Sequence, residues 1–129
     1  MGDMRIRFEN GALSPIELAA AFAALPADVT FVDADGIVRY YSEYRIFSRT
    51  PECLDRDVLA CHSESSRPGI ARMLSEFAGG WRDDALFIGE KDGRVINIRY
   101  VAVRDSGDSY LGCLEIAQWA DGAADDGEL

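Results

Sequence analysis

Residues 28–43 read "DVTFVDADGIVRYYSE", and this stretch predicts a β-hairpin. Two runs rich in β-branched and aromatic residues, 29–33 and 37–42, flank the dipeptide Asp35-Gly36. Asp-Gly is favoured in tight turns because glycine adopts positive φ without steric penalty. The rest of the predicted sheet is built outward from this hairpin.

A helix is predicted immediately before the hairpin, over residues 14–25 of "LSPIELAAAFAAL". Ser14 and Glu17 have the spacing of a capping box, and Pro15 suits the first helical position. The helix should end at Pro26. Its stripe of small and apolar residues must lie against another surface, because an apolar helix face is unstable in water.

A second helix and three more strands follow the hairpin. In "SRPGIARMLSEFAGG", apolar residues follow the i, i+3, i+4, i+7 pattern, and Gly79-Gly80 ends the helix. The strands are expected at 84–90, 94–104 and 109–118, joined by the turns "KDGR" and "DSGDS". Strands joined by hairpins predict an antiparallel sheet, with the helical region 43–79 covering one face. The fold class is therefore α+β.

Composition limits the organisation and the function. The chain has 129 residues and a net charge of −10, which suits one domain and argues against nucleic-acid binding. We expect an N-terminal extension over 1–12, a single domain over 13–118 and a disordered acidic tail over 119–129. Without a signal peptide or a membrane-length apolar run, a cytoplasmic location is expected, away from any membrane.

The sequence carries no recognisable catalytic or metal-binding motif. There is no nucleophile triad, phosphate-binding loop or dinucleotide fingerprint, so an enzyme is not expected. Three cysteines do not suggest a disulfide framework, and one histidine does not suggest a zinc site. Cys61 and His62 are adjacent, and neighbours on an extended chain point in opposite directions, so a working Cys–His pair is not expected.

Several blocks resemble one known family. The stretches "LSPIELAAAFAALPADVTFVDADGIVRYYSE", "RIFSRTP", "IRYVAVRD" and "YLGCLEIAQ" resemble the PAS domain at the C-terminal end of prokaryotic proteins that usually also carry a haemerythrin-like HHE domain. The resemblance covers about residues 13–118. It implies five antiparallel strands in the spatial order 2-1-5-4-3, with the helical segment closing a cavity over the sheet.

This sequence also departs from that family. Residues 61–66 read "CHSESS" where the family resembles "CHPPKS", and the segment before "RIF" is shorter. No haemerythrin-like domain accompanies the resemblance, so a diiron function is not transferred. If this chain is the whole protein, its signalling partner is expected on a separate polypeptide.

The resemblance implies a non-enzymatic sensory module that binds a small molecule or cofactor of unknown identity in the cavity. Three arginines around the predicted cavity mouth, Arg45, Arg49 and Arg67, favour an anionic ligand, because guanidinium groups bind carboxylates and phosphates well. The alternative is that they form surface ion pairs, which contribute little. The candidate ligand contacts are Arg45, Phe47, Arg49, His62, Ser66, Asn97, Arg99 and Glu115.

Two of these candidates carry more specific hypotheses. His62 is either an axial haem ligand or a hydrogen-bonded structural residue. Arg99 is expected to face Glu115 across the last two strands, if the turn sets the register in which paired positions sum to 214. Val101 would then face Cys113. On the helix-covered face the Arg99–Glu115 pair would be largely desolvated and would specify polar chemistry; the alternative is an exposed pair on the outer face of the sheet.

A second function is a ligand-free module for homodimerisation or protein interaction. The small side chains of helix 14–25 would allow a second protomer to approach closely. A cavity filled by Phe47, Leu74 and Tyr100 would favour this interpretation. Residues expected in the core or cavity wall are Phe31, Phe47, Leu54, Val58, Ile70, Leu74, Phe87, Ile98, Tyr100, Leu114 and Ile116.

Overall fold

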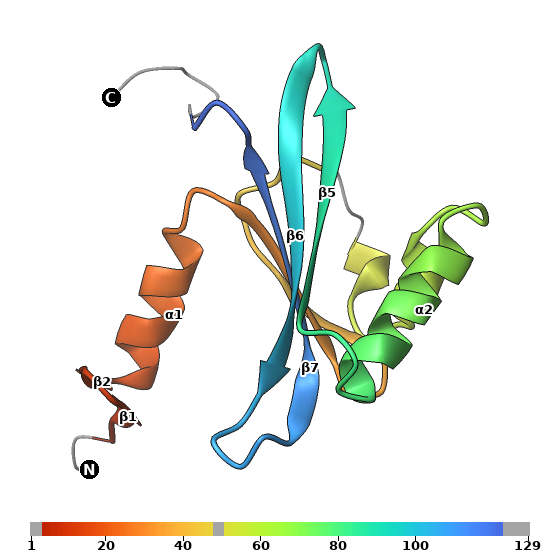
Figure 1. Cartoon of the computed structure of the whole chain (residues 1–129). Coiled ribbons are helices and arrows are strands. Elements are labelled where there is room, and N and C mark those ends of the chain that lie inside the picture. The colour runs from red at the N-terminus through yellow and green to blue at the C-terminus, as the bar shows by residue number, and fades with distance from the viewer. Residues whose placement is uncertain (1–3, 48–50, 123–129) are drawn as a thin grey trace.

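The chain forms one five-stranded antiparallel sheet with helices on both sides (Figure 1). The computed structural model describes residues 4–47 and 51–122. The strands of this sheet are β3 (Asp28–Asp33), β4 (Val38–Tyr41), β5 (Asp84–Lys91), β6 (Arg94–Arg104) and β7 (Tyr110–Trp119). Their spatial order is β4-β3-β7-β6-β5. This is the predicted order 2-1-5-4-3, and it confirms the α+β class.

The helices divide between the two sides of the sheet. On one side lie the short 3₁₀ helices η1 (Pro51–Cys53) and η2 (Val58–Cys61) and the helix α2 (Arg67–Ala78), whereas α1 (Pro15–Ala23) lies on the other (Figure 1). A small hairpin of β1 (Ile6–Phe8) and β2 (Gly11–Leu13) precedes α1 and was not predicted. No helix in the described part of the chain is long and apolar enough to cross a membrane.

The predicted capping box is present at the start of α1. The Ser14 Oγ accepts a hydrogen bond from the Glu17 backbone N–H at 3.1 Å. The Glu17 carboxylate in turn accepts one from the Ser14 N–H at 2.8 Å. Two N–H groups that lack intrahelical partners are thus satisfied, which explains why α1 begins at this point.

The sheet face toward α2, called the inner face below, carries two apolar clusters. One cluster joins Val32, Val38, Val58, Met73, Phe77, Ala85 and Cys113, and the other joins Ile46, Ile96 and Ala117. Two residues expected in the core are exposed instead: Leu54 at 41% and Phe87 at 48%. Phe87 is exposed because β5 is an edge strand, and Leu54 because it lies just after η1.

A β-bulge changes the register between β6 and β7. Beside the turn, Arg104 faces Tyr110, which agrees with the predicted register. Leu111 then lies opposite no residue, and from Val103–Gly112 onward the pairing is displaced by one. Because strand side chains alternate between faces, this displacement changes which residues share a face.

The predicted pairing of Arg99 with Glu115 is therefore wrong. Arg99 faces Ile116, Tyr100 faces Glu115, and Val101 faces Leu114. Turn residues alone could not indicate this, since the bulge lies inside β7 beyond the turn.

The end of β7 also differs from the prediction. The tail was expected from residue 119, but Trp119 belongs to β7 and packs against the cluster around Ile96. The chain is described up to Gly122. Residues 123–129, which make up most of the predicted tail, lie outside the described residues.

Candidate functional site

Three polar side chains form a row across the centre of the inner face. Thr30 on β3 is the cross-strand partner of Glu115 on β7, and Glu115 is the partner of Tyr100 on β6. Thr30 is 1% exposed and Glu115 is 8% exposed. The Tyr100 hydroxyl donates a hydrogen bond to Glu115 Oε2 at 3.1 Å. The covered centre of the sheet is therefore polar.

The Thr30 hydroxyl has no hydrogen-bond partner among residues 4–47 and 51–122. Burying a hydroxyl without a partner costs about 1–3 kcal/mol, so most buried polar groups in proteins are satisfied. A bound molecule that reached Thr30 would therefore gain a hydrogen bond that the protein alone does not make.

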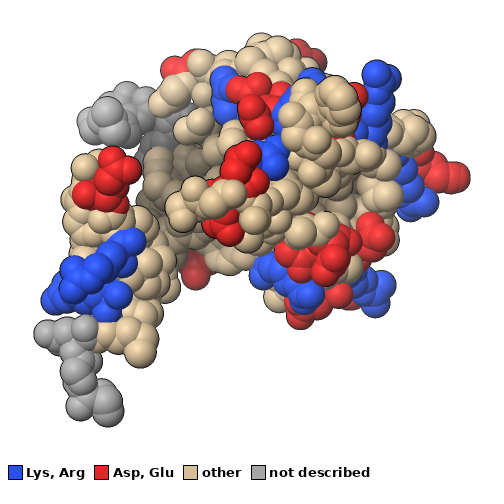
Figure 2. Space-filling model, turned by 60° about the horizontal axis from the view of Figure 1, so that its bottom comes forward, with Lys and Arg blue, Asp and Glu red and all other residues tan. Residues whose placement is uncertain are grey.

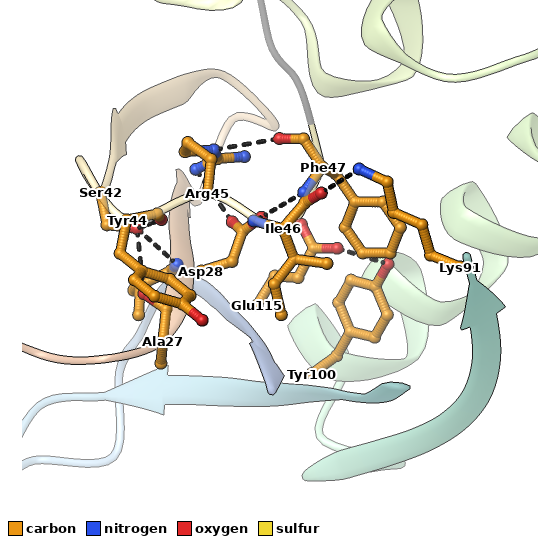
Figure 3. A network of polar contacts seen from close by, with 11 residues as sticks. Ala27, Asp28, Ser42, Tyr44, Arg45, Ile46, Phe47, Lys91, Tyr100 and Glu115 are labelled. Atoms are coloured by element: carbon orange, nitrogen blue, oxygen red, sulfur yellow. Dashed lines mark hydrogen bonds and ion pairs between the residues drawn. The ribbon is translucent and has the colours of Figure 1, made fainter. Parts of the chain in front are cut away.

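A short segment crosses the inner face next to this row. Residues 44–47, called the strap below, are held by Asp28, which lies two residues before Thr30 on the same face of β3 (Figure 3). One Asp28 oxygen accepts from the N–H groups of Ile46 and Phe47, both at 2.9 Å. The other oxygen lies 2.9 Å from Arg45 Nη1.

The strap is anchored from a second direction by β5. The Lys91 ammonium donates a hydrogen bond to the Ile46 carbonyl oxygen (Figure 3). Lys91 is the only lysine in the chain. The Ile46 side chain is buried in the cluster that contains Ile96 and Ala117. Both backbone groups of Ile46 and its side chain are thus bound, which closes the strap over this part of the sheet.

Apolar groups surround the polar row. The Phe87 ring meets the Tyr100 ring edge-on, with centroids 5.7 Å apart. Phe47 and Ile98 pack against the cluster that holds Ile46. A few polar groups within an apolar wall are typical of small-molecule sites, where the polar groups fix orientation.

Two of the predicted arginines take part in holding the fold together. Arg45 binds Asp28, donates to the Phe47 carbonyl at 3.2 Å, and lies over the Tyr41 ring at 5.1 Å from its centroid. Arg67 Nε donates to the carbonyls of Leu59 and His62. These contacts weaken the case for an anionic ligand. Arg49 lies outside the described residues.

His62 and Ser66 make local contacts within the helical segment. His62 Nδ1 lies 2.9 Å from the Val58 carbonyl oxygen, which suits a structural N–H donor. Ser66 is exposed before α2, and its hydroxyl lies 3.0 Å from that of Ser63. Among the described residues, no group of three or more His, Cys, Asp or Glu side chains could hold a metal ion.

Asn97 and Arg99 lie on the face opposite the polar row, which we call the outer face. They alternate along β6 with Ile98 and Tyr100, which lie on the inner face. Arg99 lies 3.7 Å from Asp84, and both side chains are exposed. The predicted position of these two residues in an inner cavity is therefore wrong. For Arg99 the reason is the register, and for Asn97 it is the alternation along β6, which puts Asn97 and Tyr100 on opposite faces.

Cys113 lies beside Glu115 on β7 and is buried in the core cluster. Burial, together with the nearby Glu115 carboxylate, raises the pKa of the Cys113 thiol to about 12. A thiol in this environment stays protonated at neutral pH and is a poor nucleophile.

Asp28, Thr30 and Lys91 were missed as site residues. A signal for the first two exists in "DVTFV", where Asp28 and Thr30 alternate with Val29 and Phe31. Two polar residues on one face of a strand that is buried on both faces indicate a polar interior. Lys91 gave no such signal, because its partner is 45 residues away in the sequence.

Comparisons with known proteins give a consistent match. A family model described as a PAS domain matches residues 18–118. A crystal structure of a C-terminal domain from Streptococcus mutans is 28% identical, with a TM-score of 0.83, and the match covers 91% of this chain and 92% of that one. Among proteins with curated descriptions, none matches this sequence.

Two more distant structures share the fold. The PAS domain of a Colwellia psychrerythraea protein is 15% identical, with a TM-score of 0.61 over 81% of this chain and 94% of that one. A sensory box sensor histidine kinase from Vibrio cholerae is 10% identical, with a TM-score of 0.58 over 81% of this chain and 90% of that one.

Proposed function

Because this chain belongs to the PAS domain family, we propose that it is a sensory module that binds a small molecule between the inner face and the strap. The row of Thr30, Glu115 and Tyr100 is the observation that carries this proposal. Polar groups beneath a cover cost stability unless they are satisfied, so their presence favours a role in binding over a role in folding.

The surroundings suggest the kind of ligand. Phe47, Phe87 and Ile98 suit a compact apolar or aromatic body. Thr30 offers a hydroxyl that can donate or accept, so the ligand needs at least one polar group at that end. We propose that the ligand is a small, largely apolar molecule with one hydrogen-bonding end, and that it is not a multiply charged anion.

Such a ligand would act by changing the position of the strap. Bound ligand shifts an equilibrium only by its differential affinity for the two states. The strap residues cover the polar row and are bound by Asp28 and Lys91. A molecule on the row would therefore contact the strap, whose position these two residues fix.

Native mass spectrometry of freshly purified protein tests this proposal. We expect a bound mass in the wild type, or small molecules from a mixed library that shift the amide NMR signals of Thr30 and Tyr100. Thr30→Val and Tyr100→Phe should weaken binding about tenfold, the value of one or two hydrogen bonds. Tyr40→Phe is the matched control, because Tyr40 lies opposite Phe31, on the outer face.

Two outcomes would overturn it. Either the protein carries no bound mass and no library member shifts those signals, or both inner-face variants bind as tightly as Tyr40→Phe. The contact of His62 with Val58 does not argue against haem ligation, because an imidazole that donates its Nδ1–H to a carbonyl keeps Nε2 available as a ligand.

A second function, homodimerisation, is supported by α1. None of its residues is buried, and Ile16 is 81% exposed. Leu86 and Ile88 on the outer face of β5 are exposed too. Figure 2 shows the limb that carries α1, at the left, standing out from the body, with acidic and basic side chains among uncharged ones. Two uncovered apolar surfaces on one chain suit reciprocal contact with a second copy.

Light scattering with size-exclusion chromatography tests this second function. The wild type should run as a dimer and Ile16→Glu as a monomer, since a charge at the centre of an apolar interface is strongly unfavourable. Glu9→Ala changes an exposed residue on the β1–β2 turn and serves as the control. A monomeric wild type at high protein concentration would contradict it.

A further inference from the structure

The turn between β5 and β6 carries two cations that bind different parts of the chain. Lys91 and Arg94 are cross-strand partners at the end of the hairpin. Asp92 and Gly93 between them have φ values of 53° and 78°, so the connection is a tight two-residue turn. The backbones of Lys91 and Arg94 are therefore held directly opposite each other.

Each cation binds a segment that is remote from the other in sequence. Lys91 holds the Ile46 carbonyl of the strap. Arg94 donates to both carboxylate oxygens of Asp121, at 3.1 and 3.2 Å, and lies 3.9 Å above the Trp119 ring. Residues 119–122, where the chain leaves β7, are called the exit below. One hairpin end thus anchors both the strap and the exit.

The strap and the exit also share apolar packing. Ile46 from the strap and Trp119 from the exit belong to one cluster with Ile96 and Ala117. Ile96 is the cross-strand partner of Trp119. The Ala120 N–H donates to the Val95 carbonyl at 2.9 Å, which holds the exit beside β6. Close-packed clusters of this kind transmit displacement, because they contain little free space.

We infer that opening of the strap and release of the exit are energetically coupled through Lys91, Arg94 and the cluster around Ile96. Strap opening removes the Lys91 hydrogen bond and withdraws Ile46 from the side chain cluster that supports Trp119. Release of the exit removes Asp121 and Trp119 from Arg94. Coupling of this kind is reciprocal by thermodynamic necessity, so each segment should respond to a change in the other.

The inference depends on the proposed function only in treating strap opening as the step that a ligand would bias. The coupling itself exists without ligand and is measured without one. A failure of ligand binding would therefore leave it intact, and a failure of coupling would leave the ligand site intact.

Amide hydrogen exchange followed by NMR tests the coupling in the full chain. The amides of Ile46 and Phe47 report the strap, and those of Ala120 and Gly122 report the exit. Asp121→Asn should accelerate exchange at Ile46 and Phe47 at least about threefold. Lys91→Met should accelerate exchange at Ala120 and Gly122 by a similar factor, since local opening follows the loss of local contacts.

Glu76→Gln is the matched control. It weakens two ion pairs, with Arg72 and Arg82, that lie on and beside α2. All rates are divided by those of the Val32 and Cys113 amides in the core, which removes any global loss of stability. Asp121 is exposed, so its variant should fold. The proposed coupling is wrong if Asp121→Asn accelerates exchange only at the exit amides, while the strap amides exchange at the same rate as in Glu76→Gln.

Discussion

The two helices differ in a way that their composition does not predict. α1 is the more apolar of the two, yet it buries none of its residues. α2 carries two arginines and a glutamate, yet it buries Met73 and Phe77 against the sheet. A helix is covered when its apolar side chains meet a complementary surface of the same chain, and overall apolarity does not guarantee this.

Position in the chain explains the difference. α2 enters from η2 and is followed directly by β5, so it is confined over the inner face. α1 is linked to the sheet at one end only, and its main aromatic contact is Phe22 with Tyr40, at 5.2 Å between ring centroids. The comparison predicts that α2 determines the stability of the domain and that α1 is available for another contact.

The largest contrast is expected between Phe77→Ala and Phe22→Ala. Phe77 is fully buried, so its loss leaves a cavity and should reduce the free energy of unfolding by about 3–5 kcal/mol. Phe22 is partly exposed, and its loss should cost about 1 kcal/mol, the value of an aromatic pair. Urea denaturation followed by circular dichroism measures both. Equal losses would mean that α1 contributes to the core as much as α2.

A smaller effect is expected at the end of α2. Arg104 Nη2 donates to the Phe77 carbonyl oxygen at 2.7 Å, and the Arg104 side chain is only 17% exposed. Neither helix has a basic residue in its own last turn, so Arg104 supplies this cation to α2 from β6. Arg104→Met should therefore reduce the free energy of unfolding by about 2 kcal/mol, the value of a charged hydrogen bond.

Arg72→Met is the control for this prediction, because the Arg72 side chain is 82% exposed in its pair with Glu76. Exposed pairs contribute about 0.5 kcal/mol or less. The same urea titration applies. The prediction fails if the two variants are equally stable.

The smallest effect is expected in the response of α1 to low pH. The Ser14 N–H binds the Glu17 carboxylate and lowers the pKa of Glu17 below its usual 4.5. The folded pKa is below the unfolded one, so this stabilisation is complete above pH 4.5 and is lost as pH falls through the lowered pKa. Helical NMR shifts of α1 should therefore decrease near that pH, while those of Ile96 and Ala117 in the sheet stay constant.

Glu17→Gln provides the comparison, because its amide keeps an acceptor but does not titrate. In this variant, the α1 shifts should no longer depend on pH in that range. If the shifts of Ile96 and Ala117 change together with those of α1 in the wild type, α1 unfolds together with the core, contrary to the comparison above.

Local signals in the sequence predict the elements well. The capping box of Ser14 and Glu17 and the turn at Asp35-Gly36 are formed by residues a few positions apart, so their chemistry is visible in the sequence. The β1–β2 hairpin was missed because its strands have three residues each and little apolar alternation. Residues 1–12 therefore seemed to lack structure.

Non-local features were harder to predict. Arg45, Phe47 and Glu115 were chosen as site residues, and the structure brings all three to the inner face. Asn97 and Arg99 were chosen too but lie on the outer face. For Arg99 the cause is an extra residue in β7 that no turn motif announces. Asn97 was placed in the cavity together with Tyr100, although residues three apart on a strand lie on opposite faces. Lys91 and its contact with the strap depend on tertiary folding alone.

The bulge at Leu111 has a consequence for how this interior can change over evolution. Gly112, the next residue, approaches β3 so closely that an added Cβ would lie 2.1 Å from the Val32 carbonyl oxygen, so no larger residue fits there. Loss of one codon at Leu111 would remove the bulge but keep Val103 opposite Gly112 and Tyr100 opposite Glu115, because only the unpaired residue is lost. A deletion at this position would thus straighten β7 and leave the chemical character of the inner face unchanged.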